Sequence, residues 1–310
     1  MIVAISQPGD RHATAVLAAL RARGARAVLL DLAEIPRRGR IALRYGRGGG
    51  ERLLATRAAA IRARDVTAVW WRRPRALVAD PRLGAASAGF AVRQSAEALM
   101  GLASILDARW VNDPWREAVA NRKAHQLAAA EREGLPVPRT LVTNDAARAR
   151  AFIRAGGRGG TVHKALAATP EDWRPTRLVA PDDVRRLSAI RHAPVVLQEY
   201  VPGVDVRVTV VGRALFAAAI DARATRSPED FRPAFDDARV APCTLPADVA
   251  RRLRALVAAL GLRYAAVDLR RRDDGEHVFL EANPAGQWLF VERRTGQPIT
   301  EAVARLLAGR

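Results

Sequence analysis

Short apolar runs alternate with stretches of helical periodicity along the first part of the chain. The runs MIVAIS, AVLLDL, VTAVWWRRP and ARWVND predict strands, and helices are expected near residues 12–23 and 87–106. Strands that alternate with helices favour a parallel sheet with covered faces. The region lacks the G-x-G-x-x-G fingerprint, so its pattern does not predict a dinucleotide site. We expect an N-terminal α/β domain over residues 1–112.

Residues 113–197 predict a second, smaller unit. Its expected elements are a helix that carries Lys123, a short helix capped by Asn144 or Asp145, and a glycine-rich turn that leads into a strand with Lys164. Asn and Asp are favoured caps because their side chains accept hydrogen bonds from the first free amides of a helix.

Residues 198–310 predict a third unit with longer strands. Two apolar runs joined at Gly212, VDVRVTVVG and ALFAAAID, are typical of a hairpin. A polar loop is expected over residues 222–240, and helices are expected over residues 247–260 and 298–308.

A candidate metal site comes from the pattern near the C-terminus. The pair Asp274–Gly275 predicts a two-residue turn, which would place Asp268 directly opposite Glu281 and put Asn283 on the same face. Opposed carboxylates repel each other, and Mg²⁺ would relieve that repulsion because it prefers a few carboxylate oxygens plus waters and phosphates. The residues expected to pack on the opposite face are Val267, Leu269, Val278 and Leu280.

Composition adds a positive field and singles out two residues. The 310 residues include 51 basic and 32 acidic side chains, a formal charge of +19. Lys123 and Lys164 are the only lysines, and a lysine kept among so many arginines suits a compact phosphate-binding charge. The arginines are scattered over nearly every predicted helix. We therefore favour a compositional habit, or steering of an acidic substrate, over nucleic-acid binding.

The cellular context is read from cysteine and from hydropathy. A single cysteine, Cys243, excludes an internal disulfide and fits a reducing compartment. The opening MIVAIS lacks the features of a signal peptide, and no apolar run approaches the roughly 20 residues that span a bilayer. A cytoplasmic location is expected, without membrane association.

A nucleotide pocket is suggested by the connector Gln198–Gly203, which leaves an apolar strand and breaks at Pro-Gly. Its backbone could meet an adenine edge, Asp205 could accept from a ribose hydroxyl, and Arg207 could reach a phosphate. Taken alone, a surface hairpin with ordinary charges fits these residues equally well. At the end of an N-terminal strand, Arg72 and Arg73 either bind substrate acids or form a salt-bridged strand end.

Together these motifs resemble the ATP-grasp enzymes, and more closely the ATP-grasp ribosomal peptide maturases, also called graspetide or microviridin-type synthetases. The ATP-grasp likeness lies in N-x-K, V-H-K, Q-E-Y-V, D-V-R-V-T-V-V-G and D-L-R…F-L-E-A-N-P. The maturase likeness lies in W-W-R-R-P, W-V-N, L-P-V-P-R-T-L-V-T-N-D and N-P-A-G-Q-W. The stretch ALAATPEDW after Lys164 lacks the phosphate-lid glycines of many ATP-grasp enzymes.

The resemblance implies three sets of site residues in an ATP-grasp fold with an N-terminal pre-ATP-grasp domain. ATP would be held by Lys123, Lys164, Gln198, Glu199, Val201 and Asp205. Mg²⁺ would be held by Asp268, Glu281 and Asn283. The transferred phosphoryl group would be stabilised by Arg207 and Arg232.

The implied activity is an ATP-dependent carboxylate ligase. It would phosphorylate Asp or Glu side chains of an acidic, leader-bearing ribosomal precursor peptide and close macrocyclic esters or amides, and a homodimer is the habit of the family. Two alternatives stay open: an intermolecular ligase of the ribosomal-protein glutamylating type, and an ATP-binding protein without catalysis. A short acidic precursor gene beside this one would favour the maturase.

Overall fold

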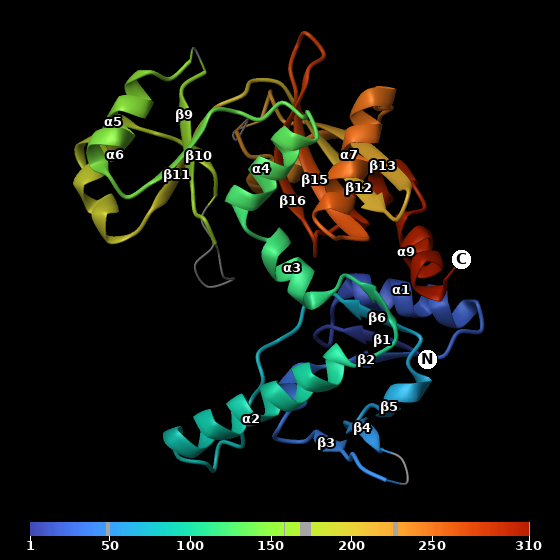
Figure 1. Ribbon diagram of the computed structural model, residues 1–310. Coiled ribbons are helices and arrows are strands. Elements are labelled where there is room, and N and C mark those ends of the chain that lie inside the picture. The colour runs from blue at the N-terminus through green and yellow to red at the C-terminus, as the bar shows by residue number, and fades with distance from the viewer. Residues whose placement is uncertain (48–49, 158, 168–174, 226–228, 310) are drawn as a thin grey trace.

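The computed structural model describes residues 1–310 except 48–49, 158, 168–174, 226–228 and 310. Figure 1 shows three lobes that follow the chain in order, with the N-terminal strands below, the lobe of β9–β11 at the upper left, and the C-terminal strands at the upper right. No helix within these described ranges is long and apolar enough to cross a membrane.

The N-terminal sheet is parallel, as predicted. Its strands run in the order β2-β1-β6-β7, and each neighbouring pair is parallel. Helix α1 follows the first strand and is capped by Asp10, whose side chain accepts from the amides of His12 and Ala13. The elements are β1 (Ile2–Ile5), α1 (Arg11–Ala22), β2 (Ala27–Leu30), β6 (Ala68–Trp71), α2 (Ala85–Ser104) and β7 (Arg109–Val111).

A small antiparallel sheet between β2 and β6 was not predicted. Its strands, in the order β3-β4-β5, are short and bury few side chains, Leu54 and Ile61 among them, so their apolar pattern is weak. The long helix α2 projects from this end of the molecule (Figure 1). The bounds of the small sheet are β3 (Arg40–Leu43), β4 (Arg52–Ala55) and β5 (Ala60–Arg62).

The described part of the middle of the chain forms four α-helices and a four-stranded sheet. Helix α3 (Pro114–Ala120) was not predicted; Asp113 caps it and a proline begins it. Helix α4 (Lys123–Arg132) begins at Lys123. Of the two candidate caps, Asp145 caps α5. The sheet order is β10-β9-β11-β8. Its elements are β8 (Thr140–Thr143), α5 (Ala146–Arg154), β9 (Thr161–Lys164), β10 (Arg177–Leu178), α6 (Pro181–Arg185) and β11 (Val195–Glu199).

The C-terminal sheet is antiparallel with the order β14-β13-β12-β15-β16. The predicted hairpin at Gly212 is confirmed: Val211 pairs with Ala214, and Gly212 has a φ of +59°. Part of the loop expected at 222–240 is a short helix followed by a strand. The elements are β12 (Val204–Val211), β13 (Ala214–Asp221), β14 (Arg239–Pro242), α7 (Ala247–Ala259), β15 (Tyr264–Arg271), β16 (His277–Asn283), α8 (Leu289–Thr295) and α9 (Ile299–Ala308).

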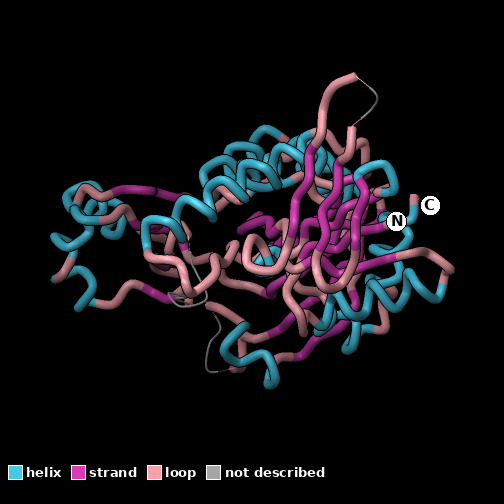
Figure 2. The backbone as a smooth tube through the Cα atoms, turned by 90° about the horizontal axis from the view of Figure 1, so that it is seen from below, coloured by secondary structure: helices cyan, strands magenta, loops and turns pink. Residues whose placement is uncertain are grey.

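Short 3-10 helices complete the structure as η1 (Leu32–Glu34), η2 (Ala63–Asp65), η3 (Leu187–His192) and η4 (Arg232–Asp237). The N-terminal and C-terminal lobes share one core, in which Leu20 of α1, Trp288 and Leu307 of α9 are buried together. The view from below shows many of the strands in the middle of the molecule, with helices on both sides of them (Figure 2). The expected domain boundaries at 112 and 197 stay a prediction.

Candidate active site

The β15–β16 hairpin brings Asp268 and Glu281 face to face. Asp268 pairs with Glu281 and Ala266 pairs with Asn283, so the predicted pairing of the acids is confirmed. The predicted two-residue turn is wrong, however. The amide of Arg272 donates to the carbonyl of Glu276 (2.9 Å), which makes the loop three residues, 273–275. A register shift next to Asp268 compensates for the extra loop residue.

This register shift changes which residues of β16 face the core. Leu269 pairs with Phe279, and both are fully buried in the cluster beneath the sheet. Leu280 was expected to pack there but lines the cleft instead. Val278 was expected there too, but it pairs with the cleft residue Arg270 and so lies on the cleft side of the sheet. The expectations for Val267 and Leu269 are confirmed, because both are buried in that cluster.

Each of the opposed carboxylates has a cation of its own. Arg207 of β12 binds Asp268 through two nitrogens, with Nη2 3.1 Å from Oδ2. Lys123 Nζ lies 3.1 Å from Oε2 of Glu281. Mg²⁺ was expected to relieve the repulsion between the two carboxylates. The structure corrects this expectation, because these side chains already reduce the repulsion.

Burial and the neighbouring charges shift the pKa values of the two acids in opposite directions. Burial raises the pKa of Asp268 and the neighbouring Glu281 raises it further, against the effect of Arg207. Burial also opposes ionisation of Glu281, but Lys123, Lys164 and Arg232 outweigh it and lower the pKa of Glu281 to about 2. Glu281 is thus a firm anion, whereas Asp268 would gain from a further cation.

A cleft of about 620 Å³, including space open to solvent, lies above this acid pair between β11, the connector after it, β12, η4 and the hairpin. Among the predicted site residues, those lining it are Lys164, Gln198, Glu199, Val201, Asp205, Arg232, Asp268 and Glu281. Lys123 and Arg207 lie beside it through their contacts with Glu281 and Asp268. Asn283 is exposed further along β16, and its Oδ1 accepts from the amide of Ala285 (3.1 Å).

The connector after β11 is fixed on both sides. The side chain of Gln198 accepts from Lys164 Nζ (2.9 Å) and donates to Thr140 Oγ1 (2.8 Å), so it ties the two neighbouring strands together. Gly203 is required where the connector meets β15: its φ is +142°, and a Cβ there would lie 2.1 Å from the carbonyl oxygen of Arg271. The Pro-Gly break therefore serves close approach as well as the turn.

Asp205 is a buried acid of the cleft, and one of its oxygens lacks a hydrogen-bond donor among the described residues. It is 7% exposed, it lies 3.3 Å from Arg270, and its Oδ2 accepts no hydrogen bond from any side chain or amide of the described residues. Burial raises its pKa to about 7. A buried acceptor without a donor is costly, so a hydroxyl-bearing ligand suits this position.

Two basic residues line the cleft wall near the acids. Burial lowers the pKa of Lys164 to about 8, although Glu281 raises it. Arg232 begins η4 and binds Asp230 through two nitrogens at 2.7 and 2.6 Å; burial opposes its charge, but Asp230 outweighs that and raises its pKa. The stretch ALAATPEDW after Lys164, which lacks the phosphate-lid glycines, lies largely outside the described residues.

Arg72 is not placed to bind a substrate acid. Its side chain is 1% exposed, donates to the carbonyls of Ala285 and Gly286 and pairs with Asp10, so the alternative of a salt-bridged strand end is confirmed for Arg72. Arg73 lies next to it, with Nη2 3.5 Å from the carbonyl of Ala285. Trp70 is buried in the shared core.

Sequence reasoning missed several cleft residues. Arg270 alternates with Asp268 on β15, and period two could have placed it in the cleft. The others come from the irregular segment after β13 or from positions without a chemical signal. The full set of missed cleft residues is Val162, Thr176, Tyr200, Glu229, Asp230, Phe231, Arg270 and Leu280.

The donor set fits a magnesium nucleotide. Two carboxylates and one amide oxygen leave coordination positions for phosphates and water, which is the usual way in which Mg²⁺ is bound. Within the described ranges no group of three or more His, Cys, Asp or Glu residues could hold a metal by itself. A metal bound here would therefore depend on the nucleotide for part of its coordination.

Comparison with known proteins agrees with this geometry. Residues 1–118 match the family model of the MvdD pre-ATP-grasp domain. The structure of macrocyclase MdnC bound with precursor peptide MdnA, from Microcystis aeruginosa MRC, is 26% identical, with a TM-score of 0.88 and full coverage of both chains. Macrocyclase MdnB of the same organism is 28% identical, with a TM-score of 0.83 and coverage of 99% and 98%.

A third structure is the ATP-grasp ligase PsnB complexed with a phosphomimetic variant of a minimal precursor, Mg and ADP. It is 25% identical, with a TM-score of 0.78 and coverage of 99% of this chain and 97% of PsnB. No curated protein sequence matches the chain. The fold is thus ATP-grasp with an N-terminal pre-ATP-grasp domain, as predicted from the sequence.

Proposed function

We propose that this chain, which belongs to the ATP-grasp ribosomal peptide maturases, uses Mg-ATP to close side-chain macrocycles in an acidic precursor peptide. A carboxylate is a poor acylating group because oxide is a poor leaving group. In the proposed reaction, an Asp or Glu oxygen of the peptide attacks the γ-phosphorus of ATP, and ADP leaves. A Ser or Thr hydroxyl, or a Lys amine, then attacks the acyl phosphate, loses its proton and expels phosphate.

The observation that carries this proposal is the convergence of cations on one acid pair. Lys123 binds Glu281, Arg207 binds Asp268, and the charges of Lys164 and Arg232 both act on Glu281. Phosphoryl transfer needs positioning and neutralisation of charge more than covalent help from the protein. This arrangement provides both without a nucleophile.

Each residue would have a distinct task. We assign Lys123 and Lys164 to the phosphates, and Gln198, Glu199 and Val201 to the wall around adenine. Asp205, with its buried oxygen lacking a donor, would accept from the ribose. Arg207 and Arg232 would face the transferred phosphoryl group.

A magnesium ion would be held by Asp268, Glu281 and Asn283 and would neutralise phosphate oxygens. Asp268 is the ligand with most to gain, since its pKa is raised by burial. Because Arg207 binds both oxygens of Asp268 in this structure, it would have to share that carboxylate with the ion.

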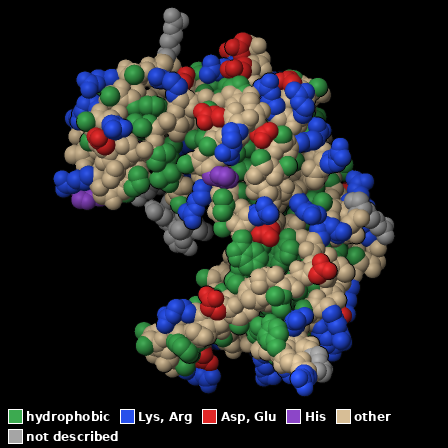
Figure 3. Space-filling view, in the orientation of Figure 1, with side chains coloured by type: hydrophobic (Ala, Val, Ile, Leu, Met, Phe, Trp, Pro, Cys, Tyr) green, Lys and Arg blue, Asp and Glu red, His purple; other side chains and the backbone are tan. Residues whose placement is uncertain are grey.

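The peptide substrate would be acidic. Lys and Arg side chains are spread over the visible face of the molecule, and a hollow between the upper lobes and α2 opens at the left of this view (Figure 3). A broad positive field steers an anionic partner and weakens with salt. Binding of a leader segment and assembly as a homodimer belong to this proposal as well.

The experiment is ATP turnover with an acidic, leader-bearing peptide encoded beside this chain, followed by intact mass. Loss of one water per ring from the peptide, together with ADP, supports ring closure. ADP formed with a gain of mass on a separate acceptor would show an intermolecular ligase. ATP binding without ADP formation under any condition would show a protein that does not catalyse.

A further inference from the structure

The turn between β16 and α8 is held by side chains from two lobes. Arg72 Nη1 donates to the carbonyl of Gly286 (2.8 Å) and also to that of Ala285. The neighbouring carbonyls are bound too, that of Pro284 by Asn112 Nδ2 (3.1 Å) and that of Gln287 by Arg207 Nη1 (3.3 Å). Tyr264 adds a hydrogen bond from its hydroxyl to Gly286 (2.9 Å).

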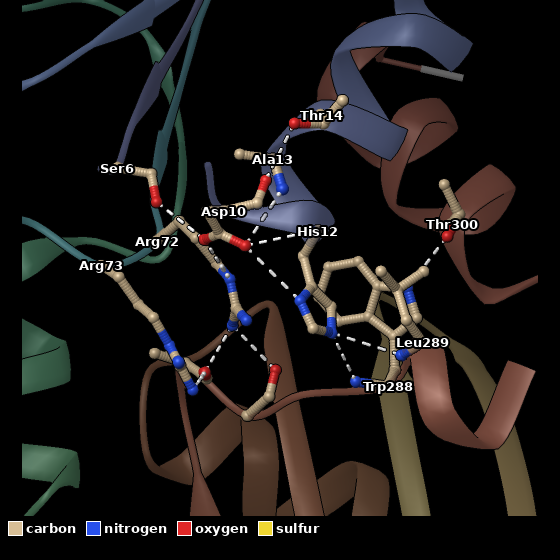
Figure 4. Close-up of polar contacts among 12 residues, drawn as sticks. Ser6, Asp10, His12, Ala13, Thr14, Arg72, Arg73, Trp288, Leu289 and Thr300 are labelled. Carbon is tan, nitrogen blue, oxygen red and sulfur yellow. Dashed lines mark hydrogen bonds and ion pairs between the residues drawn. The ribbon is translucent and has the colours of Figure 1, made fainter. Parts of the chain in front are cut away.

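His12 of α1 holds the other end of this turn. Its Nε2 accepts from the amides of Trp288 (3.1 Å) and Leu289 (3.2 Å), the point where α8 begins (Figure 4). An accepting Nε2 carries no proton, so the ring is neutral with its proton on Nδ1, which faces Asp10 at 3.5 Å. Burial also lowers the pKa of His12, which favours this neutral form.

Arg72 occupies a closely fitted socket. Its guanidinium lies 5.3 Å from the centre of the Trp288 ring and 5.9 Å from that of Trp70, and Nε lies 3.5 Å from Asp10 Oδ2. Although burial opposes ionisation of Asp10, hydrogen bonds from His12 and Ser6 and the charge of Arg72 hold its pKa below the ordinary value. A buried charge needs such partners, so Arg72 has little freedom to move.

The turn is directly joined to the acid pair. Asn283 and Glu281 end the strand that runs into it, and Arg207 connects the carbonyl of Gln287 to the carboxylate of Asp268. A displacement of the turn would therefore shift both carboxylates of the acid pair. The turn also packs tightly against β15 at Gly286, because a Cβ there would lie 2.2 Å from that of Ala266.

We propose that Asp10, His12 and Arg72 are positioning residues, through which the N-terminal lobe fixes the metal-binding end of β16. None of them reaches the cleft, so they act only through the turn. This inference deepens the proposed function and rests on its magnesium nucleotide site. It gives the N-terminal lobe a part in nucleotide binding as well as any part in peptide recognition.

The test is the Mg²⁺ dependence of ADP binding, measured by calorimetry without peptide. Groups that orient metal ligands typically change metal affinity 10- to 100-fold when removed. Arg72→Met and His12→Ala are therefore expected to raise the Mg²⁺ concentration for half-maximal ADP binding at least about tenfold. His12→Gln keeps a carbonyl acceptor and is expected to recover most of the loss.

The control is Arg23→Met, which breaks the ion pair between α1 and Glu301 of α9. This contact joins the same two lobes away from the turn, so the Mg²⁺ requirement should stay within twofold of wild type. Wild-type behaviour of Arg72→Met and His12→Ala would overturn the inference, as would an equal rise in Arg23→Met. If Arg72→Met does not fold, the comparison of His12→Ala with His12→Gln decides.

This experiment also distinguishes the proposed ring chemistry from the nucleotide site. A wild-type protein that binds Mg-ADP but forms no ring overturns only the proposed ring chemistry, and the variant comparison then stands by itself. A wild-type protein that binds no Mg-ADP overturns both.

Discussion

Asp268 and Glu281 lie directly opposite each other on β15 and β16, yet each carboxylate is bound by a different cation, Arg207 and Lys123 respectively. The pair is thus part of a network of alternating charges rather than an isolated acidic couple. Arg207 comes from the neighbouring strand β12 and Lys123 from the first turn of α4. The β15–β16 hairpin, β12 and α4 must therefore all be in place before the acid pair is neutralised.

Stability and activity should separate at the Arg207–Asp268 pair. Both side chains are largely buried, so Asp268→Leu alone leaves an unpaired guanidinium and should cost about 3–5 kcal/mol in the free energy of unfolding. Adding Arg207→Met removes the unpaired charge and should restore most of that stability, while ATP turnover stays abolished. Urea unfolding and turnover of the single and double variants check this. Equal instability of the single and double variants would contradict it.

Nucleotide binding should weaken above pH 8. Lys164 must be charged to bind a phosphate, and its pKa is about 8 because of burial. As pH rises through that value the free protein loses the charge, so ADP affinity should fall by up to about tenfold per unit above pH 8. Lys164→Arg keeps its charge and should bind more weakly but without the alkaline loss. Calorimetric titration across this range, with Mg²⁺ held constant, distinguishes the two proteins.

Gly286 should tolerate no side chain. Gly286→Ala places a Cβ 2.2 Å from that of Ala266 and should destabilise the protein by about 1–3 kcal/mol. The matched control is Gly101→Ala in α2, where a Cβ meets nothing within 4 Å and the helix gains roughly 0.5–1 kcal/mol. Thermal unfolding measures both. A Gly286→Ala protein as stable as the control would show that the turn can move, against its role as a fixed support.

The close approach of Gly286 to Ala266 also predicts a rescue. Ala266→Gly removes the opposing methyl group, so the double variant Ala266→Gly/Gly286→Ala should be more stable than Gly286→Ala alone. Contacting residues are expected to show such non-additivity. Strictly additive changes in the free energy of unfolding would place the cost elsewhere.

The sequence predicted the N-terminal parallel sheet because its strands are apolar runs separated by clear helical periods. It also predicted the pairing of Asp268 with Glu281, but through two errors that cancel. The loop has one more residue than the Asp-Gly signal indicated, and the register shift beside Asp268 absorbs it. The shift puts Phe279 opposite Leu269 in the core, a long-range arrangement that no local pattern reveals.

Other features had no local signal at all. The small sheet β3–β5 has weak alternation, and the wall formed by Asp230 and Phe231 comes from an irregular segment. The buried state of Arg72 follows from contacts with residues more than two hundred positions away in the sequence. Such long-range partners decide whether an arginine binds substrate or backbone, and they become visible only in the folded chain.

The central claim is that the cleft activates a peptide carboxylate as an acyl phosphate. The most direct measurement uses an acidic precursor peptide whose Asp and Glu carboxylates carry a heavy oxygen isotope, incubated with Mg-ATP and the protein. If an acyl phosphate forms, each ring closed is expected to transfer one labelled carboxylate oxygen to the inorganic phosphate released. Rings formed with unlabelled phosphate, or ADP released while the label stays in the peptide, would contradict it.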